Sequence, residues 1–232
     1  MKPMIFSAYS VRAIQDGRKT QTRRVIKPQP DAEAEYKGIE VGDHTFETDN
    51  DMWHIRAPYQ PGDILWVREP FCEIPYEHEH IPINGGHVTL PKYAYKADSE
   101  VDYTGLWKSS RYMPKKTARL FLLVKSVWPE KLQDITAEDV FSEGIYLEPP
   151  MSLTGGQQLP KDWDKLSDLR RKEYFQDWAR MDYMAMCHFV ELLFKEYEIL
   201  WDSLNTKRGY LFKSNPWIWK IEFERTEKPC VK

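Results

Sequence analysis

The stretch GRKTQTRR, residues 17–24, places four basic side chains and two threonines within eight positions. Gly17 is typical of the residue that ends a helix, so the residues after it are predicted to form a strand. Successive side chains of a strand point to opposite faces. The two faces are then formed by Lys19, Gln21 and Arg23 and by Thr20, Thr22 and Arg24. A strand face so rich in cations indicates an anionic or strongly polar partner.

Helix and strand signals follow one another irregularly on both sides of this stretch. A short helix is predicted over residues 7–16, with Ser7 as its N-cap. Strands are predicted at 64–67, 119–127 and 217–223, where apolar residues dominate or alternate with polar ones. This order of elements predicts an α+β fold, with a barrel-like sheet as one form that it can take.

Two further helices are predicted in the second half of the chain. One begins after Thr136, with Asp139 at the capping-box position, and ends at Gly144. The other covers most of residues 164–204. Its apolar side chains recur at helical spacing and form one stripe, which consists of Phe189, Leu193, Tyr197, Leu200 and Leu204.

The composition excludes several classes of protein. With 33 basic and 36 acidic residues the net charge is -3, so any contact with nucleic acid is expected at a local patch. The three cysteines lie far apart without a C-x-x-C pair, which argues against a disulfide framework or a cysteine zinc site. The longest apolar run, Leu120–Val124, is far shorter than the ~20 residues that span a bilayer. We therefore expect a cytoplasmic protein without membrane contact, and the sequence predicts no cofactor.

Several blocks in a fixed order carry a resemblance to a known family. After the first helix come GRKTxTxR at 17–24, PGDILWVRE at 61–69 and an apolar strand. LQDITAEDVFSEGI at 132–145 and NPWIWKIEF at 215–223 follow. Together these blocks resemble an ASCH domain, a member of the PUA-like superfamily, in the longer form common in phage and prophage genomes.

The resemblance implies one domain, a small β-barrel with flanking helices and a cleft lined by the basic strand. Inserted segments are expected at about 31–60, 72–113 and 146–198. The superfamily includes RNA-binding modules, and small bacterial ASCH proteins remove the acetyl group from N4-acetylcytidine. Their active site uses a Lys and a Thr of the GRKTxT motif and a Glu of the later helix. Carried over to this chain, these catalytic positions are Lys19, Thr22 and Glu143.

Hydrolysis of an amide needs a nucleophile, a proton acceptor and stabilisation of an oxyanion. Thr22 is the candidate nucleophile, Lys19 the candidate base, and Glu143 a candidate proton shuttle. Because Lys19 and Thr22 fall on opposite faces of a regular strand, this interpretation requires a turn or bulge there. The plain alternative is that Lys19 is a solvated cation near a helix end and that Thr22 is an ordinary strand residue.

Four more residues are candidates for binding a ligand. Arg23 and Arg24 could hold an anionic or polar group, and Arg24 could also hold the oxyanion. Arg68 and Glu69 follow a buried strand and could form a wall of the cleft, with an internal ion pair at a strand end as the alternative.

The remaining signals have equally simple alternatives. Trp66, Trp217 and Trp219 could stack on a base, but filling the core is favoured. A second basic cluster, Lys115, Lys116 and Arg119, either contacts phosphates or is a surface charge run. Residues 77–80, Glu-His-Glu-His, have no third ligand spaced with them, so no metal site is predicted.

Two functions remain open at this stage. One is a hydrolase that acts on the linear amide of an acylated nucleoside, and the other is an RNA- or DNA-binding module of phage origin without catalysis. The sequence does not indicate which protein partners or which oligomeric state the chain has.

Overall fold

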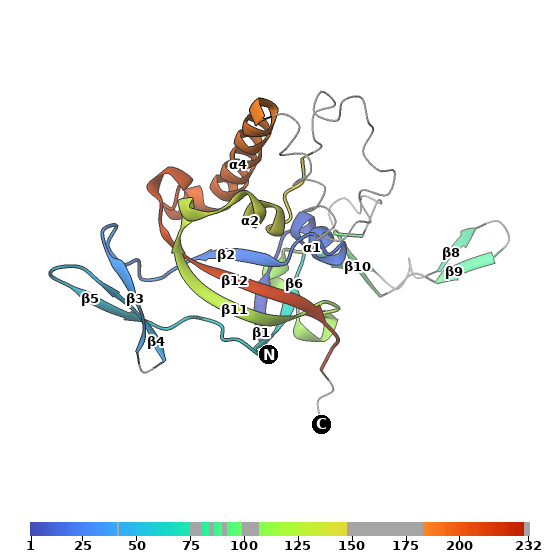
Figure 1. Ribbon diagram of the computed structural model, residues 1–232. Coiled ribbons are helices and arrows are strands. Elements are labelled where there is room, and N and C mark those ends of the chain that lie inside the picture. Colours follow the sequence, from blue (N-terminus) through green and yellow to red (C-terminus); the bar gives the residue numbers. More distant parts are fainter. Residues whose placement is uncertain are drawn as a thin grey trace. The chain divides into compact units, whose positions relative to one another are not determined.

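Helices and strands are mixed along the chain in the computed structural model, and the α+β class is confirmed (Figure 1). The structure describes residues 1–40, 42–74, 80–83, 86–89, 92–98, 107–147 and 183–229. Five strands form a mixed sheet in the order β1-β6-β11-β12-β2. These strands are Lys2–Ile5 (β1), Ile64–Arg68 (β6), Phe121–Lys131 (β11), Trp217–Thr226 (β12) and Gln21–Val25 (β2).

The five-stranded sheet is open among the described residues. Strand β1 pairs with β6 in parallel, whereas β6 pairs with β11 and β2 with β12 in antiparallel orientation. Strands β1 and β2 stand at the two ends of the order, and within the described part of the chain no pairing joins them into a closed barrel. The barrel implied by the family resemblance therefore stays a prediction.

Internal contacts divide the chain into two compact units, and each is described by itself. The first unit consists of Met1–Gln15, Gly62–Leu123 and Glu224–Lys232. The second consists of Asp16–Pro61 and Val124–Phe223. The basic stretch and Glu143 both belong to the second unit.

In the first unit, the helix predicted over residues 7–16 is formed by Ala8–Gln15 (α1). Ser7 caps it, because its Oγ accepts a hydrogen bond from the backbone N–H of Ser10 at 3.1 Å. The shorter elements are β7 (Phe71–Glu73), β8 (His80–Ile83), β9 (Gly86–Thr89), β10 (Tyr93–Tyr95), η2 (Ser110–Tyr112) and η3 (Lys115–Thr117). A core cluster holds the unit together: Trp66, Phe71, Met113, Ala118 and Phe121.

In the second unit, two helices and β12 share an apolar core. The helices are Ala137–Ser142 (α2) and Tyr183–Asn205 (α4), drawn close together in Figure 1, and the 3-10 turns are η4 (Leu132–Asp134), η7 (Thr206–Arg208) and η8 (Phe212–Ser214). The buried members of this core are Leu132, Ile135, Val140, Ile145, Leu193, Tyr197, Trp201 and Ile218.

Helix α2 begins and ends as the sequence predicts. The Thr136 hydroxyl accepts from the backbone N–H of Asp139, and the Asp139 carboxylate accepts from the backbone N–H of Thr136, both at 3.2 Å. An aspartate thus completes the capping box where glutamate is usual. Gly144, with φ of 87°, ends the helix in the left-handed conformation that glycine adopts without strain.

Helix α4 buries a slightly different stripe from the predicted one. Phe189, Leu193 and Tyr197 are buried as expected, but the next buried residue is Trp201. Leu204, the last residue of the predicted stripe, is 56% exposed and does not belong to the buried face. The buried residues of α4 are spaced four apart, so the buried residue that follows Tyr197 is Trp201 and not Leu200. Within the described residues no helix has the combination of length and apolar character needed to cross a membrane.

The segment 31–60 forms a three-stranded antiparallel sheet in the second unit. Its strands are β3 (Glu35–Glu40), β4 (Asp43–Glu47) and β5 (Met52–Ile55). Strand β4 packs its aromatic side chains on β12, with 5.0 Å between the ring centroids of Phe46 and Trp217 and 4.7 Å between those of His44 and Trp219. Trp217 and Trp219 therefore fill the core, which is the role predicted for them in preference to stacking on a base.

This aromatic packing predicts that the three-stranded sheet unfolds together with β12. We expect Phe46→Ala to lower the free energy of unfolding by about 3–5 kcal/mol, because a fully buried ring is replaced by a cavity. Urea denaturation measures this change. Met52→Ala, on the adjacent strand and 53% exposed, is the control and should cost under about 1 kcal/mol. An equally small loss for Phe46→Ala would mean that β4 does not contribute to this core.

Candidate functional site

One face of the basic stretch is filled by ion pairs and hydrogen bonds to α2 and its C-cap. Lys19 Nζ lies 2.5 Å from Glu143 Oε2, and Gln21 Nε2 lies 2.7 Å from the Asp139 carbonyl oxygen. Arg23 Nη2 lies 2.9 Å from Asp139 Oδ2. Lys19, Gln21 and Arg23 thus all contact α2 or its C-cap, which confirms the alternation of faces predicted for this stretch.

Lys19 and Glu143 meet through both backbone and side chains. The two residues form an isolated antiparallel bridge just before β2, and Lys19 Nζ also donates to the Glu143 carbonyl oxygen at 2.8 Å. Their side chains are only 3% and 6% exposed. Burial lowers the pKa of Lys19, and the ion pair with Glu143 only partly offsets this. The plain alternative of a solvated lysine is therefore wrong.

Arg23 is enclosed by three carboxylates. Its Nη2 lies 2.7 Å from Glu130 Oε1 and 2.9 Å from Asp139 Oδ2, and its Nη1 lies 3.5 Å from Glu143 Oε1. Burial alone would lower the pKa of Arg23, but the negative charges of the three carboxylates oppose this, and the pKa is raised. The guanidinium therefore already has its anionic partners within the protein.

Asp139 connects most members of this cluster. Its Oδ1 accepts from Lys220 Nζ at 2.7 Å and from Gln21 Nε2 at 3.0 Å, while Oδ2 accepts from Arg23 and from the backbone of Thr136. Burial would raise the pKa of Asp139, but these donors lower it well below the ordinary value of an aspartate. The same carboxylate thus caps α2 and anchors it to β2 and β12.

Thr22 has a different partner from Lys19. Its Oγ1 accepts a hydrogen bond from Arg24 Nη1 at 2.9 Å, and that nitrogen also donates to the Arg23 carbonyl oxygen at 3.1 Å. The register of β2 against β12 continues without a break from Gln21 to Val25, so β2 lacks the bulge that would turn Thr22 toward Lys19. The described residues therefore bring Lys19 and Glu143 together and leave Thr22 with Arg24, whose pKa is lowered by burial.

Tyr197, which the sequence places only in the apolar stripe of a helix, lies near the charges of this cluster. Tyr197 is on α4 and interacts electrostatically with Glu143 and Arg23, and its hydroxyl is buried without a hydrogen-bond partner among the described residues. Burial raises the pKa of Tyr197, and the charge of Glu143 raises it further, while Arg23 and Arg24 act in the opposite direction. The phenol is therefore neutral and lies among the charges of this cluster.

Three further charged members were not predicted as site residues. Asp139 was recognised only as a helix cap, and Glu130 and Lys220 carried no motif. The strand pairing offers a signal for Lys220. Residues that are directly paired on neighbouring antiparallel strands share a face of the sheet, and Lys220 on β12 is paired with Arg23 on β2. For Glu130 no comparable sequence signal exists.

The predicted wall residues Arg68 and Glu69 belong to the first unit and have partners there. Both Glu69 carboxylate oxygens accept from Arg119, at 2.9 Å each, and Arg68 donates to the carbonyl oxygen of Arg111. Burial raises the pKa of Glu69 although Arg119 opposes this. The internal ion pair is thus present, but its cation is Arg119.

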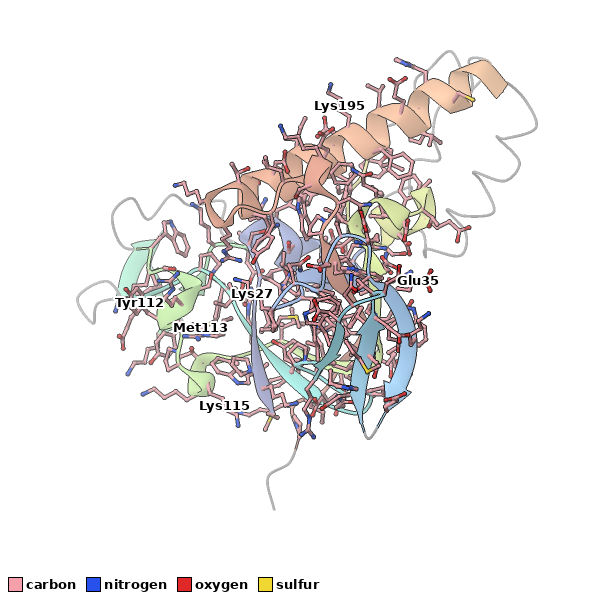
Figure 2. The ribbon with its side chains drawn as sticks, turned by 90° about the vertical axis from the view of Figure 1, so that its left-hand side faces the viewer. Lys27, Glu35, Tyr112, Met113, Lys115 and Lys195 are labelled. Atoms are coloured by element: carbon pink, nitrogen blue, oxygen red, sulfur yellow. The ribbon has the colours of Figure 1, made fainter. Side chains whose placement is uncertain are left out.

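The second basic cluster and the Glu-His-Glu-His segment have different outcomes. Arg119 forms an ion pair with Glu69. Lys115 and Lys116 of the same basic cluster are exposed, and Lys115 projects from the ribbon in Figure 2. Glu77, His78 and Glu79 lie outside the described residues. Within the described ranges no three potential metal ligands come together.

The comparisons with known proteins leave the family unassigned. A scan against family models, a search of curated proteins and a search of solved structures each find no match for this chain. The resemblance to ASCH domains therefore rests on the sequence blocks alone.

The contacts of Asp139 generate a prediction about acid stability. Because its pKa is lower in the folded chain than in the unfolded chain, its ionised form stabilises the fold fully above about pH 4. That contribution is lost as the pH falls further. We expect Asp139→Asn to cost about 2–4 kcal/mol at pH 7 and to flatten the acid limb of the stability profile.

Urea denaturation between about pH 3 and pH 7 tests this expectation, because this range extends from below the ordinary pKa of a carboxyl group to neutral pH. Glu196→Gln is the control, because it removes the same charge from an exposed position of α4 in the same unit. It should leave both the stability at neutral pH and the acid limb nearly unchanged. A similar small effect from Asp139→Asn would contradict the anchoring role.

Proposed function

We propose that this protein is an ASCH-type amidohydrolase with a PUA-like architecture, and that it hydrolyses the linear amide of an acylated nucleoside at the Lys19–Glu143 pair. The observation that carries the proposal is a buried lysine with a lowered pKa, held 2.5 Å from a buried carboxylate. A buried ionisable group with a shifted pKa beside a charged partner is typical of acid–base catalysis. The sequence blocks supply the substrate class, an N4-acetylcytidine-like amide.

In the proposed reaction, Lys19 and Glu143 move the protons. Neutral Lys19 accepts a proton from the attacking water, and the ammonium form passes it to the leaving nitrogen of the nucleobase. Water thereby adds to the acyl carbon, the C–N bond breaks, and the products are the free amine and a carboxylate with one released proton. Glu143 orients the lysine and stabilises its charged form, and Arg23 holds Glu143 from its other oxygen.

Thr22 and Arg24 have supporting roles in this scheme. The hydrogen bond from Arg24 to the Thr22 hydroxyl fixes the guanidinium beside the strand. In the proposed reaction Arg24 stabilises the oxyanion, because its charge acts on both Lys19 and Glu143. Because Thr22 lies on the face opposite Lys19, water is the proposed nucleophile, and Thr22 is a positioning residue.

The proposal predicts that Lys19 is required as a base and not merely as a cation. Lys19→Arg keeps a partner for Glu143 but remains protonated, so we expect at least about a 100-fold loss of kcat on N4-acetylcytidine with the fold intact. For the unaltered chain, the rate should rise with pH and reach half its maximum below the ordinary lysine pKa of about 10.4.

Three further variants complete that assay. Lys195→Met removes an exposed lysine of α4, labelled in Figure 2, and should retain full activity. Thr22→Ser keeps the hydroxyl and Thr22→Val removes it, so activity that survives both changes excludes Thr22 as the nucleophile. Absence of turnover of acylated cytidines by the unaltered chain would contradict the proposed reaction.

A second candidate function is binding of RNA or DNA without catalysis. The observation that favours it is the separation of Thr22 from Lys19, which leaves the lysine without a side-chain nucleophile within hydrogen-bonding distance among the described residues. Since Arg23 is enclosed by carboxylates, the exposed pair Lys115 and Lys116 is the better candidate for contacts to phosphate.

This alternative predicts a salt-dependent affinity that depends on the exposed lysines. Neutralising both in Lys115→Gln/Lys116→Gln should lower the slope of log affinity against log salt for single-stranded RNA by about 1.4, or about 0.7 for each lost phosphate contact. Fluorescence anisotropy measures the slope. Binding with an unchanged slope, or no binding at low salt, would rule out this surface.

A further inference from the structure

The side chain of Tyr112 is unusually exposed for an aromatic residue. It is 72% exposed, more than any other large hydrophobic side chain in the described part of the chain. A single exposed tyrosine is ordinary by itself. This one, however, lies in the 3-10 turn η2, within a segment, residues 107–118, that has four basic residues and no acidic one.

The turn that carries Tyr112 is fixed to the core of the first unit. The next residue, Met113, is 1% exposed and belongs to the core cluster, and its sulfur accepts from the backbone N–H of Glu69 at 3.2 Å. Arg68 donates to the carbonyl oxygen of Arg111 on the other side of Tyr112. Because the backbone is held on both sides, the ring is presented from a rigid turn, and binding costs little conformational entropy.

The cations on both sides of Tyr112 are exposed and are not neutralised within the described residues. Lys108 lies 4.0 Å from the carboxylate of Glu73. The other three cations, Arg111, Lys115 and Lys116, form no ion pair with any described residue. Figure 2 shows Tyr112 and Lys115 projecting outward from the ribbon. These three cations and Tyr112 form the Tyr112 surface.

The geometry points to the Tyr112 surface as a docking site for single-stranded nucleic acid, with a base stacked on the Tyr112 ring and phosphates bound by the three cations. Each nucleotide supplies both an aromatic face for the ring and an anion for the cations, which is the usual combination in proteins that bind single strands. In a duplex the faces of the bases are stacked on one another, so an exposed ring favours a single strand. The inference rests on the alternative function of nucleic-acid binding and narrows it, and it does not depend on the proposed reaction.

Fluorescence anisotropy of a labelled oligouridylate with the full chain tests the role of the ring. Tyr112→Ala should weaken binding about 5- to 100-fold, the usual effect of losing one base–aromatic stack. The slope of log affinity against log salt should stay unchanged, because no phosphate contact is lost. Tyr112→Phe keeps the ring and should bind as the unaltered chain does. Tyr9→Ala is the matched control, because it removes a tyrosine of α1 that is 44% exposed in the same unit, and it should also bind normally.

An abasic strand of the same length separates stacking from charge. The unaltered chain and Tyr112→Ala should bind this strand with equal affinity, because it retains the phosphates and has no base to stack. The inference would be overturned by equal affinity of the two proteins for oligouridylate, or by a loss of affinity for the abasic strand in Tyr112→Ala. Displacement of oligouridylate by polyglutamate of equal charge and at equal concentration would also overturn it, since the surface would then fit an acidic protein.

The same experiment separates the inference from the function on which it rests. Binding of oligouridylate by the unaltered chain that does not depend on Tyr112 supports nucleic-acid binding and overturns the stacking role. Absence of binding at low salt contradicts both.

Discussion

The burial of Lys19 and Arg23 against carboxylates is the constraint on which the second unit depends. An isolated charge in a protein interior costs several kcal/mol, so each cation must have its partner nearby. Helix α2 supplies Asp139, and its C-cap supplies Glu143, while β12 supplies Lys220 to balance the shared carboxylate. The position of α2 along β2 is therefore fixed by electrostatics as well as by its apolar core. A slip of one residue would point the cations to the opposite face of the strand.

The alternation of β2 also separates two kinds of chemistry. One face holds the lysine–glutamate pair, which can move protons, and the other holds the Thr22–Arg24 hydrogen bond, which can position a cation. A hydrolase built on this strand must use both faces or recruit water on one of them. The regular register from Gln21 to Val25 makes water the simpler solution, because no bulge brings the threonine across.

Local signals in the sequence were sufficient to predict the helix caps, the main strands and the faces of β2, because each depends on neighbouring residues. Thr136 and Gly144 define α2, and the spacing of Lys19 and Arg23 defines their shared face. The partners of these cations were harder to predict. Glu130 and Lys220 meet Arg23 and Asp139 only through long-range pairing, and a tyrosine in an apolar stripe looks the same whether its hydroxyl is satisfied or not.

The depth of the cluster limits what can bind to it. The Lys19 and Arg23 side chains are 3% and 0% exposed, so a phosphate backbone running over the surface cannot contact their charged groups directly. A ligand of this cluster must instead be small or must insert a small group, such as an acyl substituent or a carboxylate. Inside the protein, where the dielectric constant is low, the fixed positions of Lys19, Arg23 and their carboxylate partners discriminate strongly between such groups. The same burial that makes the cluster unsuited to a polymer is therefore compatible with the small acyl group of the proposed substrate.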